Sequence, residues 1–454
     1  MEKKIQWNNY LIQPLVPADI DTSKYHNILQ HSSALTVKVA GQITQITGNL
    51  VKARIPNAKI GDLCVICTLN KKYISAQVVG FDDEEVYLTP IDRLEAVGPK
   101  TTIINCGDQL KVGVSDKLLG RVVDALGRPI DGLGEVPYQQ FYPTYCQAPK
   151  VMQRSRINSP LPVGVRAVDL LLPVGEGQRL GVFSTAGVGK SSLLGMIARN
   201  STADVNVVAL VGERGREVRD FLAESLGEGL KKSVVVVSTS DETPLRRITA
   251  AYTAMAIAEY FRDQGQRVML LMDSVTRFAR AHREIALSLG ELPARQGYPP
   301  SVFNALPEYF ERAGKVEKGS ITGFFTVLLS SEQIEDPLGE EMRAILDGHI
   351  YLSSRLAHHQ HYPAIDILRS ISRLSDQIAS EKHQALMQRF KRLWSVYEEN
   401  YDLINIGAYK KGSDAAIDEA IAMHAKLQQF LIQHKATYMN FQSTLDKAAE
   451  VLGL

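Results

Sequence analysis

The spacing of apolar residues changes along the chain and divides it into regions of different structure. Between Leu35 and about Val97, apolar and polar residues alternate in short runs such as Leu50–Pro56 and Glu85–Pro90, with Gly, Asn, Asp and Pro at the turns. Alternation of this kind indicates strands that bury one face, and regular turns between such strands indicate a small barrel or sandwich. We therefore expect a β-barrel domain over residues 31–98.

Between residues 99 and 375 the strands become apolar throughout, and helical segments separate them. Continuous apolar strands that alternate with helices indicate an α/β domain, with a parallel sheet covered on both faces. We expect strands at Arg179–Phe183, Val205–Val211, Ser233–Ser238, Val268–Met272, Ile321–Leu329 and His349–Leu352, and helices at Ser191–Asn200, Glu217–Leu226, Leu245–Asp263 and Thr276–Leu287.

The two ends of the chain lack this alternation of strands and helices. Residues 376–454 are rich in Ala, Leu, Gln and Lys and predict a helical C-terminal domain, with one evident loop between Gly407 and Gly412. Residues 1–30 are polar and are interrupted by Pro14 and Pro17. This first segment is either a frayed terminus or a docking segment for a partner.

Composition narrows the class of protein. A length of 454 residues, with 45% hydrophobic and 22% charged residues, fits a globular protein of two to four domains. The formal net charge of +1 gives no general attraction to nucleic acid or anionic lipid. The barrel region has few aromatic residues, so we favour a structural or oligomerising barrel over a nucleic-acid-binding one. We find no run of 18 apolar residues and no signal-peptide pattern, so we expect the protein to stay in the compartment where it is made.

Two clusters of potential metal ligands are weak signals. Cys64 and Cys67 form a C-x-x-C spacing, but they lie in an apolar, strand-like run with no second pair downstream. Burial as small apolar residues is the favoured interpretation, and a redox or zinc site is the alternative. His358, His359 and His361 have no cysteine or carboxylate at ligand spacing, so we interpret them as a surface turn.

The strongest chemical signal is a glycine-rich segment that reads S-T-A-G-V-G-K-S and differs only at its first residue from the P-loop pattern G-x-x-x-x-G-K-[ST]. It lies between an expected strand and an expected helix, so a P-loop is favoured over a plain glycine-rich turn. Backbone N–H groups of such a loop surround phosphates at the positive end of the helix. We expect Lys190 to contact the β- and γ-phosphates and Ser191 to ligate Mg²⁺. The residues of this segment predicted to bind the nucleotide are Ser184, Thr185, Ala186, Gly187, Val188, Gly189, Lys190, Ser191 and Ser192.

Three further candidates lie where expected strands end. Asp273 follows V-M-L-L-M, where an acid can hold Mg²⁺ through water, and the alternative is an N-cap for the next helix. Glu213 follows another strand in V-G-E-R-G-R-E, where a carboxylate can polarise the attacking water. Arg214 beside it can stabilise charge on the γ-phosphate, although a charged run of this kind is also typical of a helix start.

The chain resembles the rotary ATPases, and within that superfamily it is more similar to the ATPases of type III protein export. The P-loop ending G-V-G-K-S and the following G-E-R are shared with rotary catalytic β subunits, and export ATPases similarly lack the first glycine of the loop. The C-terminal D-L-I-N-I-G-A-Y-K-K-G-S-D resembles the flagellar branch more than the virulence branch. Collinear segments over most of residues 150–375 carry the resemblance: E-G-L-K-K-S-V-V-V-V-S-T-S-D-E, M-D-S-V-T-R-F-A-R-A-H-R-E-I-A, G-Y-P-P-S-V-F, R-A-I-L-D-G-H-I-Y-L-S and H-Y-P-A-I-D-I.

This resemblance implies a RecA-like P-loop ATPase domain over residues 99–375 and a role for each matched residue. It implies that Glu213 is the catalytic base and that Arg214 contacts the γ-phosphate. It also implies that Tyr362, in H-Y-P-A-I-D, stacks on adenine, and that Arg373, in S-I-S-R, is donated across a subunit boundary. The catalytic residues implied are Lys190, Glu213, Arg214 and Arg373, and the residues implied at the magnesium are Ser191 and Asp273.

The same resemblance implies a function and partners. A homohexamer would hydrolyse MgATP to energise flagellar protein export, in the cytoplasm at the inner face of the cytoplasmic membrane. The implied partners are a regulatory stator-like protein, a central stalk protein, the membrane export gate, and export substrates with their chaperones, without nucleic acid. The alternatives are a virulence type III secretion ATPase, an ATP synthase catalytic β subunit and an RNA-translocating hexamer. The neutral charge and the aromatic-poor barrel count against the last of these.

Overall fold

The computed structural model describes residues 39–70, 72–83, 85–332 and 336–454. Residues 1–30, interpreted from the sequence as a frayed terminus or a docking segment, lie outside these ranges. The chain forms two compact units, one ending at Lys111 and the other running from Val112 to Leu454. Within the described ranges, no helix combines the length and the apolar character that crossing a membrane would require.

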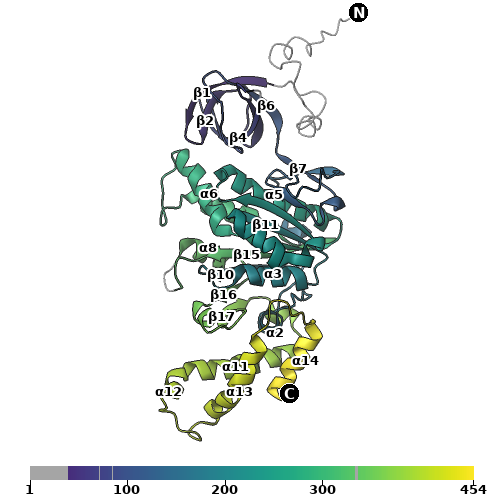
Figure 1. Ribbon diagram of the computed structural model, residues 1–454, viewed down its shortest axis with the longest axis vertical. Helices are drawn as coiled ribbons and strands as arrows, with labels where there is room; N and C mark the ends of the chain where they lie inside the picture. The colour runs from purple at the N-terminus through teal and green to yellow at the C-terminus, as the bar shows by residue number, and fades with distance from the viewer. Residues whose placement is uncertain (1–38, 71, 84, 333–335) are drawn as a thin grey trace, which may run out of the picture. The chain divides into compact units, whose positions relative to one another are not determined.

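The first unit contains a closed six-stranded barrel, which confirms the β-barrel prediction (Figure 1). Along β2, Val51 and Ala53 are fully buried and alternate with more exposed residues, as the sequence pattern predicts. The strand β6 pairs with both β1 and β3 and closes the barrel, so the barrel extends to Gln109 and the expected boundary at residue 98 is too early. Without β6, β1 and β3 would be open edges. The strands are β1 (Val39–Thr47), β2 (Leu50–Arg54), β3 (Asp62–Cys67), β4 (Tyr73–Asp82), β5 (Glu85–Pro90) and β6 (Thr102–Gln109).

The second unit is built on a nine-stranded sheet with the order β17-β16-β10-β15-β13-β11-β12-β8, in which β14 pairs with β15. All neighbours from β16 to β8 are parallel, which confirms the predicted parallel sheet, whereas β17 and β14 are antiparallel to their neighbours. A separate two-stranded sheet pairs β7 with β9. The strands are β7 (Lys111–Val114), β8 (Val122–Asp124), β9 (Gln140–Pro143), β10 (Arg179–Ser184), β11 (Val205–Glu213), β12 (Ser233–Thr239), β13 (Arg267–Asp273), β14 (Gly314–Val316), β15 (Gly319–Leu328), β16 (Gly348–Leu352) and β17 (Ile365–Ser372).

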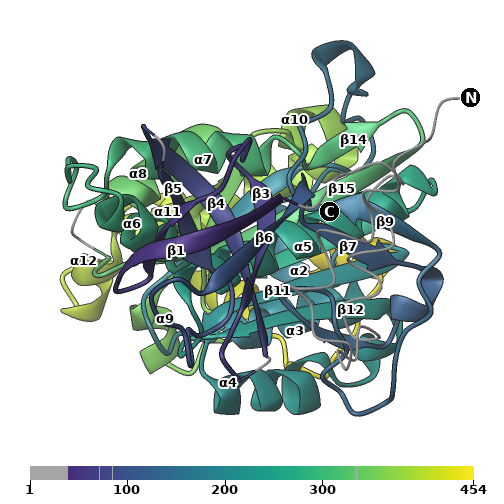
Figure 2. The ribbon, with the colours of Figure 1, turned by 90° about the horizontal axis from the view of Figure 1, so that it is seen from above.

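Helices cover both faces of this sheet. On β11, Val208 and Leu210 belong to the hydrophobic cluster that includes α3, whereas Val207, Ala209 and Val211 belong to the cluster that includes α5 and α6. Figure 2 shows α3 and α4 on one side and α6, α7 and α8 on the other. Because both faces are buried, the central strands are apolar almost throughout. The helices are α2 (Arg166–Leu171), α3 (Lys190–Asn200), α4 (Gly215–Asp220), α5 (Pro244–Asp263), α6 (Val275–Ser288), α7 (Pro300–Phe310), α8 (Pro337–Ile345) and α9 (Ser354–His358).

The helix expected at Glu217–Leu226 is divided: α4 ends at Asp220, and Phe221–Leu226 continues as a π-helical segment. The C-terminal region is helical, as predicted, and the loop between Gly407 and Gly412 separates α12 from α13. Phe390 and Phe430, whose ring centroids lie 5.6 Å apart, join the same hydrophobic cluster as the sheet face beside α3, so these helices pack on the sheet unit. The remaining helices are α10 (Ser375–Ile378), α11 (Glu381–Glu399), α12 (Tyr401–Asn405), α13 (Ala415–Leu431) and α14 (Phe441–Leu452).

Candidate active site

The glycine-rich segment connects β10 directly to α3, which is the strand, loop and helix order that a P-loop requires. Gly187 and Gly189 have φ angles of 80° and 91°, in the left-handed region that favours glycine. A Cβ on Gly189 would lie 3.4 Å from the ring of Tyr362. The left-handed backbone is therefore the reason for glycine at these two positions, and the Tyr362 ring lies beside Gly189 at ordinary van der Waals distance. The amides of the first turn of α3, which have no partner inside the helix, begin at this point.

The carboxyl ends of three parallel strands bring Lys190, Glu213 and Asp273 together. Lys190 Nζ donates a hydrogen bond to Asp273 Oδ1 and lies 3.9 Å from Glu213 Oε1. The exposed fractions of the side chains are 12% for Lys190, 12% for Glu213 and 4% for Asp273. Thr326, on the neighbouring strand β15, donates a hydrogen bond of 2.9 Å to Asp273 Oδ1 and fixes that carboxylate. One cation thus lies between two nearly buried acids beside the loop.

Glu213 has the electrostatic character of a base that works near neutral pH. Its pKa is raised to about 7, first by burial and then by the charge of Asp273, while Lys190 and Arg277 oppose the rise in part. Glu213 Oε1 is buried and accepts no hydrogen bond from the residues that the structure describes. A carboxyl that titrates near pH 7 and has a free acceptor atom can take a proton from a water molecule.

The site offers oxygen donors of the kind that Mg²⁺ prefers, but only a few. Ser191 is exposed on the first turn of α3, and Asp273 lies at the end of β13. Across the described ranges, no group of three or more His, Cys, Asp or Glu side chains is arranged to hold a metal by itself. Magnesium commonly takes one or two protein ligands and completes its shell with water and substrate phosphates. The residues therefore fit magnesium that arrives as a complex with the nucleotide, with Ser191 and Asp273 as protein ligands.

The other predicted nucleotide-binding residues lie on or beside the loop. Ser184 is buried with a hydroxyl that lacks a partner among the described residues, and the Thr185 hydroxyl lies 2.9 Å from the Ser354 hydroxyl. Ala186, Gly187 and Ser192 are exposed, and Val188 is buried. Tyr362 is 37% exposed, and its carbonyl accepts a hydrogen bond of 2.9 Å from the amide of Gln433, which follows α13. The tyrosine is thus held beside the P-loop and is partly open to solvent.

Arg214 and Arg373 do not join this group of side chains within one chain. Arg214 is exposed at the start of α4 and forms an ion pair of 2.9 Å with Glu217. Arg373 follows β17, whose last residue Ser372 pairs with Gly348 at the start of β16, whereas the P-loop follows the carboxyl end of β10. The six residues of β10 span roughly 17–20 Å at about 3.3 Å per residue. Arg373 therefore lies near the amino end of β10, whereas its own P-loop lies at the carboxyl end.

Sequence reasoning missed three residues that the fold places near Glu213 and Asp273. Thr326 is one, and Arg247 and Arg277 are the others. A Cβ on Gly212 would lie 3.0 Å from Arg277 Cβ and 3.5 Å from Arg247 Cδ, so both arginines flank the residue before Glu213. Both arginines lie in the first turn of a helix that follows a buried strand, and this position was the signal that could have identified them.

The burial of each side chain tests the interpretations of the histidine and cysteine clusters. His358 and His359 are exposed as expected, but His361 is only 1% exposed and packs beside Trp394, so the surface-turn interpretation is wrong for His361. The residue precedes Tyr362 and is covered by α11, and burial lowers its pKa to about 4. Cys64 lies in the barrel core, where burial raises the pKa of its thiol, and Cys67 is half-buried.

Two family models match the chain. Residues 164–372 match the nucleotide-binding domain of the ATP synthase alpha/beta family, and residues 379–450 match the T3SS EscN ATPase C-terminal domain. The second match covers most of the helical region that follows residue 376. The two matches together include the P-loop, both strand-end acids and the C-terminal helices.

Curated proteins and solved structures show similarity over nearly the whole chain. A flagellum-specific ATP synthase from Treponema pallidum is 47% identical over 433 residues, which cover 95% of this chain and 96% of that protein. A type 3 secretion system ATPase from Sinorhizobium fredii is 47% identical over 409 residues, covering 90% and 91%. The assembled ATPase EscN from the enteropathogenic E. coli type III secretion system superposes with a TM-score of 0.85 at 42% identity, covering 91% of this chain and 100% of that chain. A structure of EscN with its central stalk EscO gives a TM-score of 0.84 at 43% identity, with the same coverage.

Proposed function

The chain belongs to the family of flagellum-specific ATP synthases and type 3 secretion system ATPases, and we propose that it hydrolyses MgATP to energise protein export in the flagellar branch of that family. The hydrolytic activity is supported by one observation: the side chains of Lys190, Glu213 and Asp273 lie in contact beside the P-loop. The flagellar assignment rests on the segment 402–414, which resembles flagellar members, and on flagellar relatives with up to 48% identity. The virulence branch is the second candidate, because a type 3 secretion system ATPase is 47% identical.

The proposed chemistry assigns one task to each side chain. Glu213 takes a proton from a water molecule, whose oxygen attacks the γ-phosphorus of ATP. The bond from the γ-phosphorus to the bridging oxygen breaks, and ADP leaves with that oxygen. Lys190 neutralises charge on the β- and γ-phosphates, and Ser191 and Asp273 hold the magnesium of the substrate. Tyr362, beside the loop, stacks on the adenine.

A ring of identical subunits would complete this site. Arg373 and its own P-loop lie at opposite ends of the parallel strands, so Arg373 can serve only the nucleotide of another subunit. An arginine that contacts the transferred phosphoryl group is worth about 10³–10⁵ in rate. We infer that the chain acts as a homohexamer with one site at each interface, and that Arg214 reaches the γ-phosphate when the interface closes.

The proposed partners follow from the same family. Related EscN forms an assembled ATPase and a complex with its central stalk EscO, which supports a central stalk protein for this chain. A regulatory stator-like protein, the membrane export gate, and export substrates with their chaperones are the other proposed partners. The protein would act in the cytoplasm, at the inner face of the membrane that holds the gate.

Two experiments test this proposal. Release of inorganic phosphate from MgATP should be measured for the purified protein, and the rate should vanish in Lys190→Ala. Deletion of the gene in the organism that encodes it should then abolish flagellar filaments, and a plasmid copy should restore them. Intact filaments together with loss of a virulence secretion system would assign the chain to the second branch.

A further inference from the structure

The end of β17, which carries Arg373, is held by only a short stretch of sheet pairing. Ser372 and Ile371 pair with Gly348 and His349, but the register then jumps, and the next pair joins Tyr351 to Asp366. The residues skipped on β17 form a bulge beside the ladder. A bulge leaves residues unpaired and disrupts the ladder locally. Contacts outside the ladder must therefore fix the backbone that leads into Arg373.

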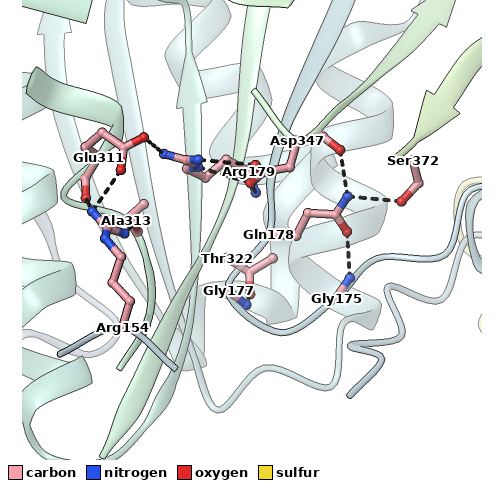
Figure 3. Close-up of polar contacts among 10 residues, drawn as sticks. All are labelled: Arg154, Gly175, Gly177, Gln178, Arg179, Glu311, Ala313, Thr322, Asp347 and Ser372. Carbon is pink, nitrogen blue, oxygen red and sulfur yellow. Dashed lines mark hydrogen bonds and ion pairs between the residues drawn. The ribbon is translucent and has the colours of Figure 1, made fainter. Parts of the chain in front are cut away.

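Asp347, the residue before β16, supplies those contacts. Its carbonyl accepts a hydrogen bond of 3.0 Å from the Arg373 amide and another of 3.1 Å from Gln178 Nε2. Gln178 is fully buried, and its Nε2 also donates to the Ser372 hydroxyl at 3.0 Å (Figure 3). The backbone carbonyl of Asp347 and the amide side chain of Gln178 thus hold the last residue of β17 and the residue after it. The Ser372 hydroxyl also donates to the Pro173 carbonyl at 2.7 Å, and Arg373 Nη2 donates to the Arg343 carbonyl at 2.8 Å.

The carboxylate of Asp347 anchors this carbonyl to the strand that leads to the P-loop. Asp347 Oδ2 accepts hydrogen bonds from the Arg179 amide at 3.0 Å and from Arg179 Nε at 3.1 Å, and Oδ1 accepts one from Arg179 Nη2 at 3.2 Å. Arg179 also pairs with Glu311, which in turn pairs with Arg154 (Figure 3). Arg179 is the first residue of β10. Asp347 therefore joins the start of β10 to the end of β17.

Asp204 and Arg267 form an ion pair of the same geometry, also at the amino ends of the parallel strands, but this pair has no contact with Arg373. Asp204 accepts hydrogen bonds from the Arg267 amide, Nε and Nη2 at 2.9, 3.1 and 2.7 Å. Arg267 is the first residue of β13, just as Arg179 is the first residue of β10. The chain thus contains an internal control, because removing the carboxylate charge at either aspartate breaks the same kind of contact.

We propose that Asp347 is a positioning residue for Arg373, which it holds in place for catalysis at the neighbouring subunit. The inference rests on the proposed function, in which Arg373 acts across the subunit boundary. Replacing the carboxylate removes its charge-assisted hydrogen bonds to Arg179 and leaves the Asp347 backbone held to that residue by one bond of 2.9 Å, from the Asp347 amide to the Arg179 carbonyl. With fewer contacts to hold it, the carbonyl that accepts from the Arg373 amide shifts. An arginine that stabilises a transition state must be placed to within about an ångström, and a displacement of that size costs about 10²-fold in rate.

The first test compares Asp347→Asn with Asp204→Asn in steady-state hydrolysis of MgATP. For Asp347→Asn we expect kcat to fall by about 10–100-fold while the affinity for a nonhydrolysable ATP analogue stays within about twofold, because the P-loop is intact. Asp204→Asn should keep both values within about twofold. A loss of kcat that is equal in the two variants would make Asp347 a structural residue only. If Asp347→Asn does not fold, Arg179→Gln replaces it, with Glu311→Gln as its control, because Arg179→Gln breaks the pair with Asp347 from the other side and also the pair with Glu311.

The second test separates this inference from the proposed function. Arg373→Ala, which should be inactive, and Asp347→Asn, which should be impaired, are each co-expressed with Glu213→Gln chains, which keep a normal Arg373 but lack the base. Asp347→Asn should regain activity in mixed rings, as Arg373→Ala should, since one type of interface then has every group intact. Recovery with Arg373→Ala but not with Asp347→Asn would overturn only the role given to Asp347. No recovery in either mixture, with co-assembly shown by differently tagged chains, would overturn the subunit-boundary role of Arg373 and the inference with it.

Discussion

We expect the Glu213 carboxylate to lower the free energy of unfolding of the protein while it serves catalysis. Glu213→Gln should therefore raise the stability of the folded state. The carboxyl is 12% exposed, has an unused acceptor atom and lies beside a second acid. Its pKa is about 7 in the folded chain, against an ordinary value of 4.5. The folded state therefore resists ionisation of this group. A glutamine has nearly the same shape but cannot ionise, so it removes the penalty together with the base.

The size and sign of the effect follow from the difference between the two pKa values. Below about pH 4.5 the carboxyl is protonated in both states, and the substitution should leave stability almost unchanged. As pH rises from 4.5 to 7 the unfolded chain loses the proton first, so the stability of the wild type falls, and the loss is complete above pH 7. At about 1.4 kcal/mol per pKa unit, the penalty removed at pH 8 is on the order of 3 kcal/mol. For the unit Val112–Leu454, with about 2.1 cal/mol/K per residue, this corresponds to about 4 °C in Tm.

Thermal unfolding without nucleotide, at pH 5 and at pH 8, measures this effect. Glu213→Gln should melt higher than the wild type at pH 8 and near it at pH 5, while hydrolysis falls by about 10²–10⁴-fold and nucleotide binding is retained. Asp204→Asn is the control of opposite sign, because Arg267 lowers the pKa of Asp204 and the loss of that charge should reduce Tm at pH 8. A Glu213→Gln variant that melts no higher than the wild type at pH 8 would refute the raised pKa and the argument built on it.

Two further substitutions test the nucleotide site. Lys190→Ala should abolish hydrolysis and weaken nucleotide binding by about 1.5–3 kcal/mol without unfolding the chain. Calorimetric titration measures the binding, and circular dichroism checks the fold. Turnover at the wild-type rate would place the site elsewhere. Tyr362→Ala should weaken binding of ATP by about 1–3 kcal/mol, the range for stacking of a base on an aromatic ring, and should weaken binding of inorganic triphosphate much less. Equal losses for both ligands would mean that Tyr362 supports the loop instead of the base.

The features that depend on local sequence were predictable. The alternation at Val51 and Ala53 and the continuous apolar run of β11 follow from burial of one face or of two. The P-loop could be identified because its glycines, its lysine and the flanking strand and helix are contiguous. The positions of Glu213 and Asp273 at the carboxyl ends of strands were predictable for the same reason and suggested their roles, whereas the roles of Tyr362 and Arg373 came only from the family resemblance.

The features that depend on strand order were not predictable. Thr326 reaches Asp273 because β15 lies between β10 and β13, an order that differs from the order along the chain. The barrel extends beyond residue 98 because β6 pairs with β1, about 60 residues earlier. His361 is buried because α11 covers its turn, which no local pattern indicates. The contacts of Asp347 likewise join the beginning of one strand to the end of another.

ATP hydrolysis by mixed rings decides whether each active site is shared between two subunits. Arg373→Ala and Glu213→Gln chains, each inactive alone, should be co-expressed with different tags and purified through both. The doubly purified rings should hydrolyse MgATP, because an interface with the nucleotide site of the first variant and the arginine of the second has every group. Mixed rings as inactive as either parent would contradict a shared site, and Arg373 would then serve its own chain.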